Sequence, residues 1–143
     1  MKHSIDGIYY QFEDSDLLEE ALTHRSIGSF NNERLEFLGD SVLNMVVAAR
    51  LFERYPESTE GDMSRMRARL VRGVTLAEVA AGIGLGRQVA MGSGELKSGG
   101  FRRSSILADS FEAVLGAIYI DGGFDACRDV ILGFFDPLID ELP

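Results

Sequence analysis

Residues 32–43 read NERLEFLGDSVL, and the interpretation of the whole chain depends on this stretch. Glu33, Glu36 and Asp40 stand at i, i+3 and i+7, which places them within about 60° of one another on a helix. Apolar residues recur every three or four positions and form a stripe almost opposite the acids. The stripe comprises Leu35, Leu38, Val42, Met45, Val46, Ala49 and Phe52. The pattern predicts a helix with one face that packs and another that carries three carboxylates.

This helix is expected to run to about Tyr55, because Pro56 follows directly and disfavours helical backbone before it. In its second half, Leu43, Val47 and Leu51 lie on the same side as the acids. A helix that is apolar nearly all round is buried on all sides. We therefore expect this half to be central and covered by other helices.

The rest of the chain shows helical periods and no strand alternation. A short helix capped by Asp14 or Ser15 is expected to end near residues 24–25, and a longer one is expected to follow a cap at Ser104 or Ser105. Further helices are predicted over residues 60–72, 74–83 and 124–138. Residues 89–103 hold four glycines and no helical period, which predicts a loop. A single all-α domain over residues 1–143 is the prediction.

The charge is distributed unevenly along the chain. The net charge is −9, which by itself argues against a nucleic-acid partner. Residues 61–108, however, carry a net charge of +5, and the remaining residues carry −14. A basic middle segment between acidic ends leaves phosphate binding open.

Cys127 is the only cysteine, so the chain cannot form an internal disulfide, and it is expected to be buried. No stretch approaches the roughly 20 apolar residues of a membrane span, and no signal-peptide pattern opens the chain. These features predict a soluble, cytoplasmic protein with no membrane partner.

A second pair of acids, Asp109 and Glu112, stands on a later helix, on the face roughly opposite its buried arc. If this face meets Glu36 and Asp40, four carboxylates converge, and like charges at 4 Å repel by about 4 kcal/mol at an effective dielectric of 20. A divalent cation would relieve that repulsion, and oxygen-only ligands favour Mg²⁺, with Mn²⁺ as a substitute, over zinc. On spacing alone, ordinary solvated acids remain an alternative.

The signature in residues 32–41 resembles that of ribonuclease III, the double-strand-specific endoribonuclease. Four further blocks resemble the bacterial catalytic domain of this family in the same order. They are ALTHRS at 21–26, EGDMSRMRARLVR at 60–72, GELKSGGFRR at 94–103 and ILADSFEAVLG at 106–116. Together the blocks cover essentially the whole chain.

The resemblance implies the helical fold of the ribonuclease III endonuclease domain and a function in RNA processing, including rRNA and mRNA maturation. It implies Mg²⁺-dependent hydrolysis of both strands of double-stranded RNA, leaving 5′-phosphate and 3′-hydroxyl ends with short 3′ overhangs. The implied metal ligands are Glu36, Asp40, Asp109 and Glu112, of which Asp40 and Glu112 are the catalytic pair. Glu33 and Glu60 match supporting acids in the same valley. No organic cofactor is expected.

The family resemblance also implies a homodimer in which Phe37 inserts into a socket on the partner subunit. Phe37 lies outside the apolar stripe, where a monomer would expose it, although ordinary packing under a loop remains an alternative. Lys97, Arg102 and Arg103 resemble a phosphate-contacting loop, and a solvated flexible loop is the alternative. The arginines at 65, 67, 69 and 72 fit either structural pairing or RNA contact.

Two other functions stay open. Nothing in the sequence resembles the double-stranded-RNA-binding domain that follows the catalytic domain in the bacterial enzyme, so an isolated catalytic domain or a naturally short relative is expected. An accessory module that binds duplex RNA without cutting it is therefore the main alternative. A phosphohydrolase for small nucleotides is disfavoured, because its usual mixed His and Asp ligand set is missing.

Overall fold

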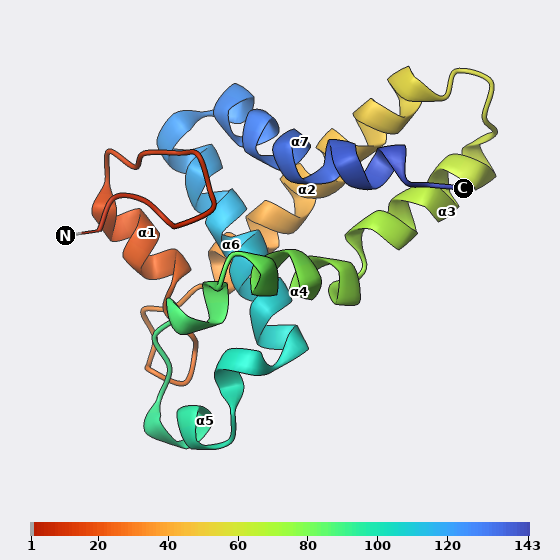
Figure 1. Cartoon of the computed structure of the whole chain (residues 1–143). Helices are drawn as coiled ribbons and strands as arrows, with labels where there is room; N and C mark the ends of the chain where they lie inside the picture. The colour runs from red at the N-terminus through yellow and green to blue at the C-terminus, as the bar shows by residue number, and fades with distance from the viewer. Residues whose placement is uncertain (1) are drawn as a thin grey trace.

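The computed structural model describes residues 2–143, which form helices, two short 3₁₀ turns and connecting segments (Figure 1). The elements are α1 (Ser15–Ala21), α2 (Glu33–Arg54), α3 (Glu60–Val71), α4 (Gly73–Gly82), η1 (Leu85–Arg87), α5 (Ser93–Lys97), η2 (Gly100–Arg102), α6 (Ser104–Gly122) and α7 (Phe124–Asp140). Between residues 2 and 143 only two isolated β-bridges occur and no strand forms. The all-α prediction is confirmed.

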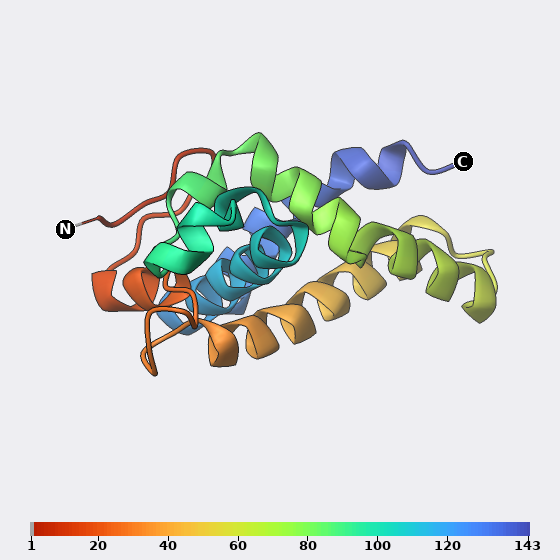
Figure 2. The same ribbon diagram turned by 90° about the horizontal axis from the view of Figure 1, so that it is seen from below.

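Helix α6 is the centre of the molecule. From residue 106 to residue 118 every position is buried except Asp109. Helices α1, α2, α4 and α7 all contact α6, and the ribbon shows them arranged around it (Figures 1 and 2). Because α6 is enclosed on nearly all sides, a charged residue on it must either reach the surface or find a partner.

Helix α2 ends at Arg54 with Tyr55 as its C-cap, as Pro56 predicts. Leu43, Val47 and Leu51 are fully buried, which confirms that the second half is covered on the acid side.

The prediction that the apolar stripe of α2 packs against other helices is only partly right. Leu35, Val42 and Val46 are buried, but Met45 is 62% exposed and Phe52 is 71% exposed. Helices α6, α7 and α3 cover one side of α2, and its outer side forms an uncovered edge of the molecule (Figure 2). The spacing of apolar residues could not distinguish the covered side from the uncovered one.

Helices α2 and α6 cross at two glycines. A Cβ built on Gly39 would overlap the carbonyl oxygen of Glu112, and one built on Gly116 would overlap the carbonyl oxygen of Leu35. Small residues at a crossing allow two helix backbones to approach more closely than larger side chains permit. This crossing brings the acids of the two helices together.

One of the two predicted helix caps is confirmed. Asp14 caps α1 by accepting a hydrogen bond from the backbone N–H of Asp16 at 2.9 Å. Thr59 caps α3 in the same way, with its Oγ1 accepting from Asp62 at 3.1 Å. The predicted serine cap of α6 is wrong, because Arg103 is the N-cap residue and no side chain caps this helix.

Residues 89–103 contain α5 and η2, so the prediction of a loop without helix is wrong in part. Arg103 pairs with Glu95 at 3.2 Å, and this contact closes the segment on itself. The chain itself closely approaches the glycine backbone in this segment. A Cβ on Gly100 would lie 2.8 Å from the sulfur of Met91 and 2.9 Å from the backbone oxygen of Glu95.

Two polar contacts fasten peripheral elements to the core. The Tyr10 hydroxyl donates to Asp121 at the end of α6 at 2.6 Å. Arg50 on α2 forms a two-pronged pair with Asp136 on α7, with N···O distances of 2.9 and 2.8 Å. Such bidentate pairs fix geometry as well as adding binding energy. No helix within residues 2–143 has the length and apolar character that crossing a membrane requires.

Candidate metal centre

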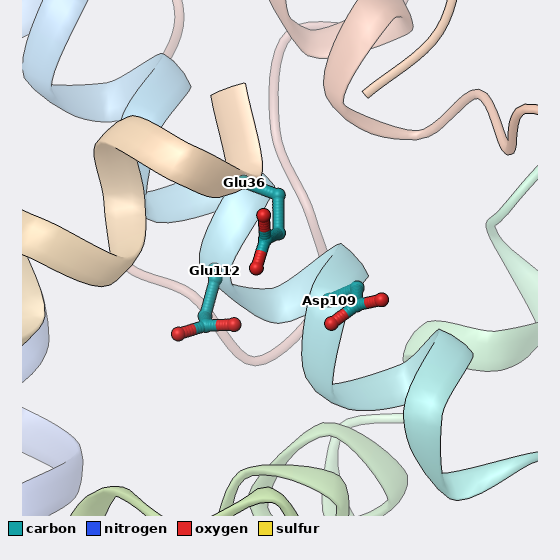
Figure 3. A group of neighbouring side chains, drawn as sticks. All are labelled: Glu36, Asp109 and Glu112. Atoms are coloured by element: carbon teal, nitrogen blue, oxygen red, sulfur yellow. The ribbon is translucent and has the colours of Figure 1, made fainter. Parts of the chain in front are cut away.

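Three carboxylates from two helices meet at the crossing of α2 and α6. Glu36 projects from α2 towards Asp109 and Glu112 of α6 (Figure 3). One oxygen from each of the three residues lies within 4.8 Å of the others. These three are among the four metal ligands predicted from the sequence, and they converge as that prediction requires.

Glu112 is buried, in contrast to the exposed acid face that the sequence pattern predicted for α6. Its side chain is covered where α2 crosses, and the residue is only 5% exposed. Burial, followed by hydrogen bonding to Asp40 and the charges of Asp40 and Glu36, raises the pKa of Glu112 to about 10. Without a cation, these surroundings favour the protonated form of Glu112.

The other two carboxylates also favour protonation. Burial and then the charge of Asp109 raise the pKa of Glu36 above its ordinary value. Burial raises the pKa of Asp109, while the neighbouring Arg25 and His24 oppose that rise. The chain thus holds three carboxylates in surroundings that disfavour their charged forms.

This donor set fits a divalent cation. Carboxylate oxygens without nitrogen or sulfur ligands select hard ions that keep oxygen ligands and waters. A cation would replace the protons that the cluster otherwise holds, and it would permit all three carboxylates to ionise. The arrangement can therefore hold a hard metal ion.

Asp40, the fourth predicted ligand, lies beside this trio. It is exposed, it is hydrogen-bonded to Glu112, and its Oδ1 accepts from the Asn44 amide at 3.4 Å. Asp40 is thus connected to the cluster through Glu112.

The two supporting acids lie in different places. Glu33 is exposed at the start of α2, near the cluster, and it pairs with Arg25 at 3.8 Å. Glu60 lies at the other end of α2, in a hollow shared with Ala48 and Phe52. Twelve or more residues of helix separate that hollow from Glu36, or roughly 18 Å at about 1.5 Å per residue. Within one chain, Glu60 does not join the carboxylate cluster.

The predicted RNA-binding residues also differ from one another. Lys97 makes no ion pair or side-chain hydrogen bond within residues 2–143, and Arg102 stacks over the ring of Phe101 at 5.1 Å. Arg103 is held by Glu95 and by the Ser98 hydroxyl at 3.3 Å. Lys97 and Arg102 are therefore available to a ligand, whereas Arg103 stabilises the fold of its own segment.

Sequence reasoning did not find the neighbours of Asp109. A polar pocket of about 360 Å³ is lined by Glu36, Asp109, His24, Arg25 and Ser105, among others. His24 makes the local hydrogen bond expected of a histidine at a helix end, with Nδ1 2.8 Å from the Ser26 hydroxyl. The only sequence signal for His24 and Arg25 was their place in the ALTHRS block.

Comparison with known proteins identifies the family. The model of the ribonuclease-III-like family matches residues 14–138. This chain belongs to the ribonuclease-III-like family. Solved nuclease domains of ribonuclease III from Campylobacter jejuni share 43% and 41% identity with it, at TM-scores of 0.87 and 0.88. They cover 90% and 94% of this chain, which in turn covers 90% and 92% of theirs.

Longer relatives in the ribonuclease-III-like family are also similar. Ribonuclease 3 of Hahella chejuensis is 57% identical over 93% of this chain, and that of Marinomonas sp. is 58% identical over 93%. The chain spans 59% of the length of both relatives. The Dicer of Pichia stipitis covers 97% of this chain at 27% identity and a TM-score of 0.71, and the chain covers 61% of it. Membership in the family confirms the resemblance seen in the sequence blocks.

Proposed function

We propose that this chain is the catalytic domain of an endoribonuclease that hydrolyses both strands of double-stranded RNA with Mg²⁺ as its cofactor. The observation that carries the proposal is the convergence of Glu36, Asp109 and Glu112, with Asp40 bonded to Glu112. Similarity to proteins named ribonuclease 3 supports it. Because the chain spans 59% of those proteins, their whole activity is attributed to it only as a proposal.

Glu36, Asp109 and Glu112 would hold Mg²⁺, or Mn²⁺ in its place, through their converging oxygens, and Asp40 would complete the set. When bound, the ion neutralises phosphate charge and makes a water more acidic. Asp40 and Glu112 would act as the catalytic pair, and Glu112, whose surroundings favour its protonated form in the free chain, would ionise to hold the cation. The helix crossing fixes both carboxylates before substrate arrives.

The reaction adds a water oxygen to phosphorus and breaks the bond from phosphorus to the 3′ oxygen, which leaves with a proton. The products are a 5′-phosphate end and a 3′-hydroxyl end. Two such sites in a dimer would cut the two strands and leave short 3′ overhangs. Processing of rRNA and mRNA in the cytoplasm is part of the proposal, which agrees with the buried, unpaired Cys127.

A homodimer is proposed through the outer side of α2. Phe37, Met45 and Phe52 are 75%, 62% and 71% exposed, and they follow one another along a single face of the helix. Exposed apolar stripes of this kind mark interfaces. One of the solved relatives is described as having a region involved in dimer formation, which supports the proposal.

The spacing of these residues favours an antiparallel pairing about a two-fold axis. Met45 lies midway between Phe37 and Phe52, so a two-fold axis near Met45 would place Phe37 of one copy beside Phe52 of the other. A pocket of about 250 Å³ next to Phe52, lined also by Leu51 and Met63, would then serve as the socket. Glu60 lines the same pocket, so the dimer would bring it towards the partner's carboxylate cluster.

Incubation with a long RNA duplex and Mg²⁺ tests the nuclease. Wild-type chain should give 5′-phosphate products, and Glu112→Ala should reduce cleavage at least a hundredfold because it removes a buried ligand. Glu78→Ala, an exposed acid on α4, is the matched control and should cleave normally. Unchanged cleavage by Glu112→Ala would contradict the assignment of Glu112 as a metal ligand.

A gel shift with the same duplex in Ca²⁺ separates cutting from binding. Binding in Ca²⁺ with no products in Mg²⁺, at any protein or salt concentration, would identify an accessory RNA-binding module instead. If the chain neither binds nor cleaves the duplex, both functions are excluded.

A further inference from the structure

The pocket of about 360 Å³ beside Asp109 combines acids with hydrogen-bond donors. Its lining includes Glu33, Glu36 and Asp109 together with His24, Arg25 and Ser105. Glu112 and Asp40 do not line it, so the pocket adjoins the carboxylate cluster on one side only. The Arg25 guanidinium and the His24 ring, lying beside carboxylates that can hold a cation, suit an anion that touches both.

Hydrogen bonds fix the ring of His24. The backbone N–H of Ser26 donates to its Nδ1 at 3.1 Å, so Nδ1 carries a lone pair and the proton of the neutral ring is on Nε2. The Ser26 hydroxyl, 2.8 Å from Nδ1, itself accepts from the backbone N–H of Gly92 at 2.8 Å. With Nδ1 occupied in this way, Nε2–H is the donor that the ring can offer to the pocket.

Arg25 is available to a ligand. Its one ion pair, with Glu33, is long at 3.8 Å, and both side chains are more than half exposed. Such pairs contribute little and exchange partners readily. The Arg25 guanidinium can therefore turn to an incoming anion without breaking a strong contact.

Two further features of the pocket lack polar partners. Ser110 Oγ, in the pocket wall, is buried without a hydrogen-bond partner among residues 2–143. Ser105 lies in the first turn of α6, whose N-terminus no side chain caps. Unsatisfied buried hydroxyls and free helix N–H groups indicate that a polar group completes the pocket.

We propose that this pocket binds one backbone phosphate of the RNA duplex, adjacent to the phosphate held at the carboxylate cluster, with the Nε2–H of His24 and the guanidinium of Arg25 as its donors. The inference rests on the proposed function, since it assigns a second contact to the same substrate. Arg25 supplies the charge, and His24 supplies a neutral donor of fixed direction. The bond from Gly92 to Ser26 links this site to the segment that carries Lys97 and Arg102.

Duplex affinity in Ca²⁺, measured by fluorescence anisotropy over a salt series, tests the site. Arg25→Ala should bind about tenfold more weakly, and its log–log salt slope should fall by about 0.9, the value for one lost phosphate contact. Arg25→Lys should keep the wild-type slope. His24→Ala should bind more weakly with an unchanged slope, because the neutral ring releases no counterion.

Mn²⁺ binding in the absence of RNA is the second measurement. Arg25→Ala and His24→Ala should bind Mn²⁺ with wild-type affinity if they contact phosphate. Arg128→Ala, an arginine on α7 outside the pocket, should match wild type in every measurement.

Two outcomes would contradict the proposed phosphate site. Arg25→Ala with wild-type affinity and slope would exclude the phosphate contact, and loss of Mn²⁺ binding in either variant would assign the residues to the metal centre instead. Failure of the nuclease proposal is recognised separately, as wild-type chain that binds duplex in Ca²⁺ but makes no products in Mg²⁺.

Discussion

Gly39 lies directly against the backbone carbonyl of Glu112, so the α2 signature touches the helix that completes the carboxylate cluster without an intervening side chain. Glu36 and Asp40 stand three residues before and one residue after this contact. The spacing of the carboxylates is therefore set by how closely two backbones approach.

Gly39→Ala should push the two helices apart. Overpacking a core contact typically costs about 1–3 kcal/mol, and here the clash is with backbone that cannot rotate away. We expect a lower Tm together with loss of cleavage and weaker Mn²⁺ binding. Gly133→Ala on α7 is the matched control: no atom would lie within 4 Å of its Cβ, so stability should stay level or rise. If Gly39→Ala has the Tm and Mn²⁺ affinity of the wild-type chain, the helix crossing does not position the carboxylates.

The limits of α2 and its buried residues follow from sequence because they depend on local rules. Pro56 ends the helix, and Leu43 and Val47 are apolar where another helix must lie. The burial of Glu112 does not follow, because it depends on Gly39 and Gly116 meeting across two helices that are far apart in sequence. Periodicity describes the faces of one helix and cannot say which face another helix will cover.

The segment around α5 shows a second feature that the sequence could not predict. Its glycines predicted a loop and its basic residues resembled a phosphate-contacting segment, but Arg103 pairs with Glu95 and the segment folds onto itself. Lys97 and Arg103 are similar cations in the sequence, and only tertiary contacts distinguish them. Likewise, the pairing of Arg50 with Asp136 joins residues 86 apart in the sequence, and no local pattern indicated it.

The stability of the metal-free chain should fall as the pH rises above about 4.5. The pKa of Glu112 is raised to about 10, and those of Glu36 and Asp109 are raised as well, so the folded chain binds more protons than the unfolded chain in this range. Stability then decreases with pH, because ionisation favours the unfolded state. Thermal melts from pH 5 to pH 9 in EDTA measure this slope.

Glu112→Gln should flatten that slope, and Glu57→Gln, an exposed residue between α2 and α3, should leave it unchanged. Mg²⁺ should raise the Tm of the wild-type chain more at pH 9 than at pH 5, because the cation replaces protons. A slope that is the same in wild type and Glu112→Gln would contradict the buried, protonated state of Glu112.

The three basic residues near α5 should respond differently to mutation. Lys97→Ala and Arg102→Ala should each weaken duplex binding in Ca²⁺ and lower the salt slope by about 0.9, with little change in Tm. Arg103→Ala should mainly lower the Tm, because Glu95 and Ser98 lose their partner. Gel shifts at several salt concentrations and thermal melts separate the two effects. If Arg103→Ala keeps a normal Tm but reduces the salt slope of duplex binding, Arg103 contacts RNA instead.

Phe37→Glu should break the proposed dimer. Loss of an aromatic anchor from an interface pocket typically costs about 2 kcal/mol or more, which weakens dimerisation at least about 30-fold. Light scattering at micromolar concentration should then report the monomer mass. Tyr9→Glu is the matched control, because Tyr9 is a fully exposed aromatic residue of the N-terminal segment and not of α2. A dimer mass retained in Phe37→Glu would place the interface elsewhere, and it would also remove the route by which Glu60 approaches a partner's carboxylates.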